Sequence, residues 1–179
     1  MGFIANQNEA YSGGIKPAGD YECIITAIEE RTTKNGAKGL DITMVVRNDV
    51  AGQRFGNGCI FYTIWRKKEP NENDMQVEGY NFAQLMAMGK AARLTDGKAY
   101  ESLKDYCADL LNKCVRVTLK HEEYNGKPQE RVSYVNPTLH PECRHVFKSS
   151  APQPQPSVQA AQTAVMAAES AAFDDGVPF

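Results

Sequence analysis

The sequence lacks the features of a membrane or secreted protein. No apolar run is long enough to span a bilayer, and the first residues, MGFIANQNEAYSGG, have neither the basic nor the apolar region of a secretory signal. The cysteines form no CxxC motif, and their odd number does not suit a complete disulfide framework. We expect a cytoplasmic protein with reduced thiols and no membrane contact. Its five cysteines are Cys23, Cys59, Cys107, Cys114 and Cys143.

Motifs of common enzymes are also absent. The chain has no Walker A loop, GxSxG, HExxH or GxGxxG motif. Acidic pairs such as Glu122 and Glu123 lie in strand-like segments, where neighbouring side chains point to opposite faces and do not form a carboxylate dyad. We therefore expect no catalytic activity. A metal-dependent nuclease built from scattered acids is kept as a third hypothesis.

One short segment contains three side chains that could bind zinc. His140, Cys143 and His145 fall within six residues, but no second cluster completes a usual four-ligand spacing. Cys114 and His121 are conceivable neighbours. We expect ordinary residues after a strand, with no metal and no cofactor.

Positive charge is missing from the end of the chain. Residues 149–179 have no lysine or arginine and three acids, whereas residues 1–148 hold all 20 basic residues and 19 of the 22 acids. A strongly basic domain would indicate nucleic-acid binding. The near-neutral charge of residues 1–148 does not indicate it by itself.

The hydrophobic pattern changes its period along the chain. Strand-like patterns are found in residues 21–31, 40–48, 59–65, 114–124 and 130–135, and residues 59–65 have large side chains on both faces. Helical spacing is found in residues 81–94 and 101–111, and Ser102 is a plausible N-cap for the second of these. Asn125 and Gly126 predict a two-residue hairpin turn between the last two strands.

The order of these segments predicts the fold. Three strands, a helical segment and a two-strand hairpin are typical of the five-stranded OB-fold barrel, which makes the protein mainly β. A small α+β sandwich would give a similar pattern. We expect a flexible N-terminal arm over residues 1–19, the OB-like domain over 20–148, a disordered linker over 149–172 and an acidic tip over 173–179.

Three segments carry a resemblance to a known family. They are GDYECIITAIEERTTKNGAKGLDITMVVRND, IFYTIWRKK and VRVTLKHEEYNGKPQERVSYVNPT. The chain, over about residues 17–148, resembles a phage and prophage family of Gram-positive bacteria that was long catalogued as a domain of unknown function and is now described as single-stranded-DNA-binding. The resemblance implies an OB-like fold and binding without catalysis, in an infected or lysogenic bacterial host cell.

The last residues resemble a second known feature. DDGVPF is similar to the acidic tip of bacterial single-stranded-DNA-binding proteins, although its acidic run is shorter and a valine replaces the usual isoleucine. The resemblance implies that the tip binds replication or recombination proteins. The candidate partner-binding residues are Phe173, Asp174, Asp175, Val177, Pro178 and Phe179.

Binding of single strands without sequence preference needs flat rings that stack on bases and cations that follow phosphates. Phe61 and Trp65 share one face of their strand, and the only tryptophan is followed directly by three cations. Ile60, Tyr62 and Ile64 are the alternative ligand-facing set, with the tryptophan in the core. The full candidate set is Lys34, Lys38, Arg47, Phe61, Trp65, Arg66, Lys67, Lys68, Lys120, Tyr124, Lys127 and Arg131.

The leading hypothesis is a sequence-tolerant single-stranded-DNA-binding protein of phage replication or recombination, which recruits partners through its tip. The alternative is a protein-interaction adaptor with an OB-like body and no direct contact with nucleic acid. The sequence leaves the oligomeric state open, a homo-oligomer included, and also the choice between DNA and RNA.

Overall fold

The structure, a computed structural model, describes residues 14–148. The chain divides into two units, Met1–Val146 and Phe147–Phe179, and nearly all the described residues belong to the first. The described elements are β1 (Gly19–Thr32), β2 (Lys38–Val46), β3 (Cys59–Trp65), α1 (Glu72–Gln76), α2 (Phe82–Ala91), α3 (Leu103–Leu110), β4 (Cys114–Tyr124) and β5 (Lys127–Pro137). No helix among them is long and apolar enough to cross a membrane.

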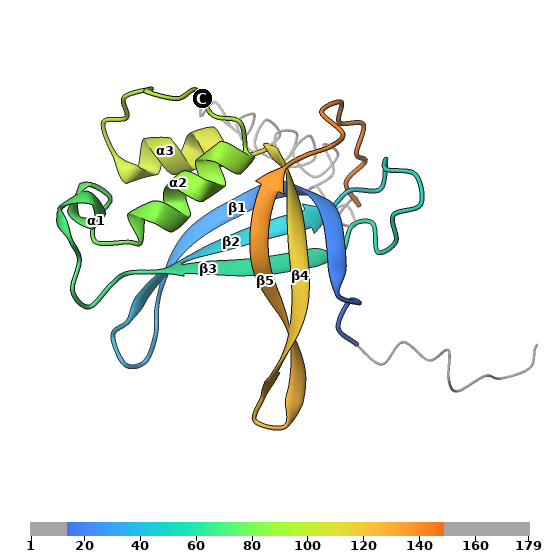
Figure 1. Cartoon of the computed structure of the whole chain (residues 1–179), viewed down its shortest axis with the longest axis horizontal. Coiled ribbons are helices and arrows are strands. Elements are labelled where there is room, and N and C mark those ends of the chain that lie inside the picture. The colour runs from blue at the N-terminus through green and yellow to red at the C-terminus, as the bar shows by residue number, and fades with distance from the viewer. Residues whose placement is uncertain (1–13, 149–179) are drawn as a thin grey trace, which may run out of the picture. The chain divides into compact units, whose positions relative to one another are not determined.

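The five strands form one antiparallel sheet. Its order is β3-β2-β1-β4-β5, so the first strand lies in the middle and pairs with both β2 and β4. Figure 1 shows the three helices grouped beside the sheet, between β3 and β4 along the chain. This is an OB-like arrangement, as predicted, but the sheet is not closed. In the described part of the chain no ladder joins β3 to β5, and both remain edge strands.

Strand alternation positions the core. Ile42, Met44 and Val46 of β2 are buried, as are the alternate residues of β4 from Val115 to Leu119. Leu85 and Met88 of α2 and Leu103, Tyr106 and Leu110 of α3 join the same apolar cluster. The alternation that the sequence predicts for β2 and β4 is thus confirmed.

The boundaries of the elements follow local signals. β3 and β4 have the predicted bounds. At the start of α3 the Ser102 side chain accepts a hydrogen bond from the Asp105 backbone N–H at 3.1 Å, which confirms the predicted N-cap. Asn125 and Gly126 have φ values of 51° and 75°, as a tight hairpin turn requires.

The short helix α1 was not predicted. Asn71 caps it and forms a capping box with Asp74, whose buried carboxylate also accepts hydrogen bonds from the Phe82 backbone N–H at 3.0 Å and from Lys67 at 2.8 Å. A five-residue helix is too short to show a hydrophobic period. The capping residues Asn71 and Asp74 were the available signal.

Residues 138–146, here called the return segment, follow β5 and pack against the outer face of the sheet. Buried Glu22 of β1 accepts hydrogen bonds from the Thr138 hydroxyl and from the Leu139 backbone N–H. Arg47 donates to the carbonyl oxygens of His140 and Glu142, each at 2.6 Å. The return segment is therefore fixed to β1 and to the end of β2 by buried polar contacts.

Gly89 is expected to tolerate no larger residue. A Cβ added there would lie 2.2 Å from the Tyr106 hydroxyl, which donates a 2.6 Å hydrogen bond to the Leu85 carbonyl oxygen. Gly89→Ala should lower the free energy of unfolding by about 1–3 kcal/mol through overpacking, measured by urea denaturation. Adding Tyr106→Phe removes the clashing oxygen and should recover part of this loss. Strict additivity of the two changes would contradict this explanation.

Candidate functional site

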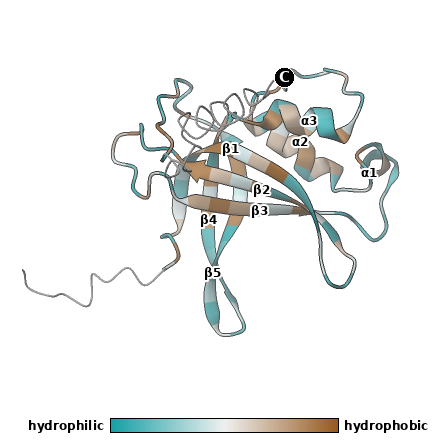
Figure 2. Ribbon diagram, turned by 180° about the vertical axis from the view of Figure 1, so that it is seen from behind, coloured by the Kyte–Doolittle hydropathy of each residue, from teal (hydrophilic) through white to brown (hydrophobic). Residues whose placement is uncertain are grey.

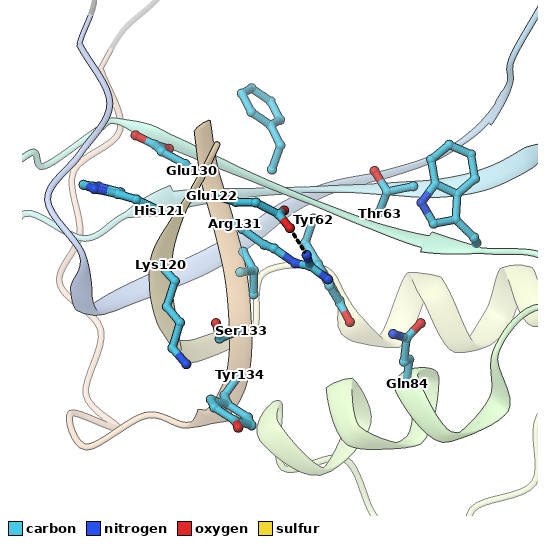
Figure 3. Close-up of a pocket in the computed structure, with 13 residues that line it drawn as sticks. Tyr62, Thr63, Gln84, Lys120, His121, Glu122, Glu130, Arg131, Ser133 and Tyr134 are labelled. Carbon is cyan, nitrogen blue, oxygen red and sulfur yellow. Dashed lines mark hydrogen bonds and ion pairs between the residues drawn. The ribbon is translucent and has the colours of Figure 1, made fainter. Parts of the chain in front are cut away.

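A groove lies between β3 and the β4–β5 hairpin, at the side where the sheet is not closed. Its volume is about 720 Å³. Figure 3 shows its lining side chains, which come from these three strands with Gln84 of α2 at one end. The lining residues are Phe61, Tyr62, Thr63, Trp65, Gln84, Lys120, His121, Glu122, Glu130, Arg131, Val132, Ser133 and Tyr134.

Three aromatic side chains of this groove are exposed. Phe61 is 69% exposed, Trp65 43% and Tyr134 63%. Ile60 and Ile64, on the opposite face of β3, are buried in the core. The structure thus decides which face of residues 59–65 points inward: the isoleucine face does, and Phe61 and Trp65 share the outer face. Tyr134 was missed by the sequence analysis, although its place in a strand after the hairpin turn could have indicated it.

The position of Trp65 depends on two residues that the sequence analysis did not select. Gly39 of β2 lies directly opposite Trp65, and a Cβ there would approach two ring carbons at 3.1 Å. The Arg31 guanidinium lies 5.5 Å from the ring centroid and pairs with Asp41. The indole ring therefore packs over Gly39, which has no side chain in its way. It also lies beside the Arg31 guanidinium, which is already paired with the Asp41 carboxylate.

Charges in the groove are mixed. Lys120 lies 5.8 Å from the Tyr134 ring centroid and has no carboxylate within ion-pair distance among the described residues. Arg131 pairs with Glu122 at 2.6 Å, the interaction drawn as a dashed line in Figure 3. Both partners are more than half exposed, so phosphate can compete for the guanidinium.

The other predicted cations do not line the groove. Lys38 pairs with Glu30 at 2.9 Å, and Lys67 pairs with buried Asp74. Lysine and tyrosine contacts hold the pKa of Glu30 below its ordinary value. The side chains that are exposed away from the groove are Lys34, Arg66, Lys68, Tyr124 and Lys127.

Tyr124 and Lys127 lie at the end of the β4–β5 hairpin. Residues 120–129 are all exposed, and Figure 2 shows that this end of the hairpin is hydrophilic. The hairpin therefore projects beyond the core, as expected for a loop that contacts a ligand. Whether these two side chains reach a strand bound in the groove stays a prediction.

The structure corrects the predicted role of Arg47. It was predicted to follow phosphates because it lies opposite the apolar face of its strand. The structure buries its side chain, which is 1% exposed, and pairs it with Asp49 at 2.6 Å and with carbonyl oxygens of the return segment. The guanidinium holds the pKa of the Asp49 carboxyl far below its ordinary value. Arg47 is a structural residue.

The predicted N-terminal arm also needs correction at its end. Lys16 donates through its ammonium group to the Cys59 carbonyl oxygen at 2.7 Å and pairs with Glu130, while its own carbonyl oxygen contacts the His121 ring at 2.6 Å. Lys16 thereby connects β3 with β4 and β5 at one end of the groove. The flexible arm predicted for residues 1–19 therefore does not include Lys16, and residues 1–13 lie outside the described range.

Part of the His140, Cys143 and His145 cluster fixes the return segment to the end of β2. The His145 Nδ1 atom accepts a hydrogen bond from the Asn48 backbone N–H at 3.1 Å. Among residues 14–148 no group of three or more His, Cys, Asp or Glu side chains is placed to hold a metal ion. The linker and the tip, with Phe173, Asp174, Asp175, Val177, Pro178 and Phe179, lie outside the described residues.

Comparison with known proteins identifies a family but no activity. No curated protein sequence matches the chain. A family model described as a protein of unknown function, DUF669, matches residues 3–154, which is most of the 179-residue chain and includes every described strand and helix. The chain belongs to the DUF669 family.

Proposed function

We propose that the protein binds single-stranded DNA in the groove between β3 and the β4–β5 hairpin, without strong sequence preference. The observation that carries the proposal is the presence of three exposed aromatic rings, Phe61, Trp65 and Tyr134, in one groove with the cation Lys120. Exposed rings are costly in water unless a ligand covers them, and every base offers a flat face on which they can stack.

Strand geometry supports two separate stacking positions. Phe61 and Trp65 are four residues apart, so their Cα atoms are about 13 Å from each other along β3. That distance is too large for one base and suits two different nucleotides. Duplex DNA hides the base faces in its own stack, which is why the proposal is restricted to single strands.

A role in phage replication or recombination is part of the proposal. It is supported by the resemblance of residues 17–148 to the phage family described above. The charges favour the alternative, an adaptor that binds protein, because Arg131 in the groove and the predicted cations Lys38 and Lys67 outside it already pair with carboxylates. A direct titration separates the two proposals.

The full chain should bind a labelled single strand well above a blunt duplex of the same sequence in a fluorescence-anisotropy titration. Release of counterions from a single strand gives a slope of log K against log salt of about −0.7 per phosphate neutralised. Few cations of the groove are unpaired, so we expect a modest slope, one that corresponds to roughly one to three neutralised phosphates. Equal binding of strand and duplex would contradict the proposal, and no binding of either would favour the adaptor.

The acidic tip is proposed to bind replication or recombination proteins. Asp174 and Asp175 suit a small basic pocket, and Phe179 suits an apolar one. Deleting residues 174–179 should leave the affinity for single strands unchanged or slightly raised and abolish capture of such proteins from a bacterial lysate. Phe179→Ala alone should nearly reproduce the loss. Unchanged capture by the truncated chain would show that the tip does not bind these partners.

A further inference from the structure

Two cysteines that are far apart in the sequence meet beneath the return segment. Cys114 is the first residue of β4, and its backbone lies opposite Ile24 of β1. Because Val115 and Val117 point into the core, the Cys114 side chain points to the outer face of the sheet. Cys143 belongs to the return segment and is exposed.

The outer face at this point is covered. Residues 21–25 of β1 are all buried, although their side chains alternate between the two faces of the sheet. The core covers one face, and the return segment covers the other, since Glu22 binds Thr138 and Leu139 there. The Arg47 guanidinium binds both the Thr138 hydroxyl, one residue beyond the Val115–Pro137 pair of the β4–β5 ladder, and the Glu142 carbonyl oxygen, so the cover brings Cys143 close to Cys114. The two thiols act electrostatically on each other there.

Polar contacts hold this arrangement on both sides of Cys143. Arg47 donates to the Glu142 carbonyl oxygen at 2.6 Å, and Asp49 accepts a hydrogen bond from the Arg144 backbone N–H at 2.7 Å. The backbone of Cys143 is therefore fixed by its two neighbours in the sequence. Both thiols also lie within electrostatic reach of the Arg47 guanidinium.

We propose that Cys114 and Cys143 form a reversible disulfide with a small disulfide oxidant such as glutathione disulfide. The exposed thiol and the half-buried thiol fit the two roles that such an exchange requires, an accessible first nucleophile and a resolving partner close to it. The site lies in the return segment, and neither cysteine lines the groove. The proposal therefore does not depend on the proposed function.

The reaction has two displacement steps. The Cys143 thiolate attacks one sulfur of glutathione disulfide and releases one glutathione thiolate. The Cys114 thiolate then attacks the Cys143 sulfur and releases the second. The protein loses two protons and two electrons, and one glutathione disulfide becomes two glutathione thiols.

The second step should depend on pH. Burial and the nearby Cys143 thiol raise the pKa of the Cys114 thiol to about 11, so its thiolate is scarce at neutral pH. The mixed disulfide should therefore accumulate at neutral pH and resolve faster as the pH rises.

The test is oxidation of the full chain with glutathione disulfide at mildly alkaline pH and low protein concentration, followed by mass spectrometry. The intact mass should fall by two hydrogen atoms and return after treatment with dithiothreitol. Trypsin cuts after Lys113, Arg116, Arg131 and Arg144, so the bond should join the peptide 114–116 to the peptide 132–144. Cys143→Ser should abolish this linked pair.

Cys59→Ser is the matched control, because Cys59 is exposed as well but is not close to Cys114, and it should leave the linked pair unchanged. The same oxidation in denaturing urea should give several pairings instead of one. A stable glutathione adduct on Cys143 without the linked peptides, or linkage that is no more selective in the folded chain than in urea, would overturn the proposal. Affinity for single strands should be the same before and after oxidation.

Discussion

Replacing both Phe61 and Trp65 with alanine should nearly abolish binding of single-stranded DNA. Stacking on an aromatic side chain contributes about 1–3 kcal/mol per base. If each ring stacks on one base, the double variant should lose about 2–6 kcal/mol of binding free energy, roughly a 30-fold to 20,000-fold rise in Kd. The measurement is an anisotropy titration with labelled oligo-dT at one fixed salt concentration.

The fold should survive this double substitution. Both rings project from the outer face of β3, while Ile60 and Ile64 of the same strand fill the core. The thermal midpoint should therefore stay close to that of the parent chain. Phe55→Ala is the matched control, because Phe55 is 40% exposed and does not line the groove. It should bind as the parent does.

The only tryptophan provides a second readout of the same prediction. Oligo-dT should quench the fluorescence of Trp65 in the parent chain and also, at higher DNA concentration, in Phe61→Ala. If the double variant bound as tightly as the parent, the groove would not be the site of stacking. A loss of several kcal/mol of stability in Trp65→Ala would show that the ring acts mainly in the fold.

Arg47→Met should have the largest effect on stability. It leaves the Asp49 carboxylate without its partner and removes the hydrogen bonds that fix the return segment at two carbonyl oxygens. Breaking a buried ion pair by removing one partner costs about 3–5 kcal/mol. The free energy of unfolding from urea denaturation should fall by this amount, and the affinity of the folded fraction for single strands should not change.

Arg131→Met is the matched control for this change. The Arg131 pair with Glu122 is more than half exposed, and such pairs contribute about 0–1 kcal/mol. A small loss of stability in Arg47→Met, equal to that of the control, would contradict the structural role of Arg47. If Arg131→Met bound single-stranded DNA more weakly and Arg47→Met did not, we would infer that Arg131 contacts the phosphates of the bound strand.

The same pair predicts a pH dependence. The folded-state pKa of Asp49 is lowered by Arg47, so the carboxylate contributes stability above its ordinary unfolded pKa of about 4. This contribution should be lost as the pH falls below that value. The loss should be smaller in Arg47→Met, because the partner that lowers the pKa is gone. Urea denaturation at several acidic pH values measures it.

The sequence predicts local structure well because local signals act within a few residues. The alternation of β2 and β4, the Ser102 cap and the turn at Asn125 and Gly126 were all available in short windows. The missed helix α1 has only five residues, too few for a hydrophobic period to repeat. The OB-like order of the strands follows from their number and from the place of the helices between β3 and β4.

The candidate site was harder to predict because long-range contacts decide which cations are available. Arg47 has the alternation of an exposed residue, but a segment more than 90 positions later in the sequence covers it. The Arg131 pair with Glu122 could have been found, since the turn at Asn125 and Gly126 makes them diagonal neighbours across the hairpin. The contact of Arg31 with Trp65 spans three strands and has no local signal.

The two walls of the groove are joined at one end by the contacts of Lys16 and not by a strand ladder of the described residues. A closed barrel would join β3 to β5 through backbone hydrogen bonds, whereas here contacts of Lys16 with Cys59, His121 and Glu130 span the gap at one end. The two walls can therefore separate without breaking a strand ladder. A purine is larger than a pyrimidine. If β3 and the β4–β5 hairpin can move apart, the groove can accommodate either base at similar energetic cost. Tolerance of base identity would then come from the missing strand pairing as much as from the aromatic rings.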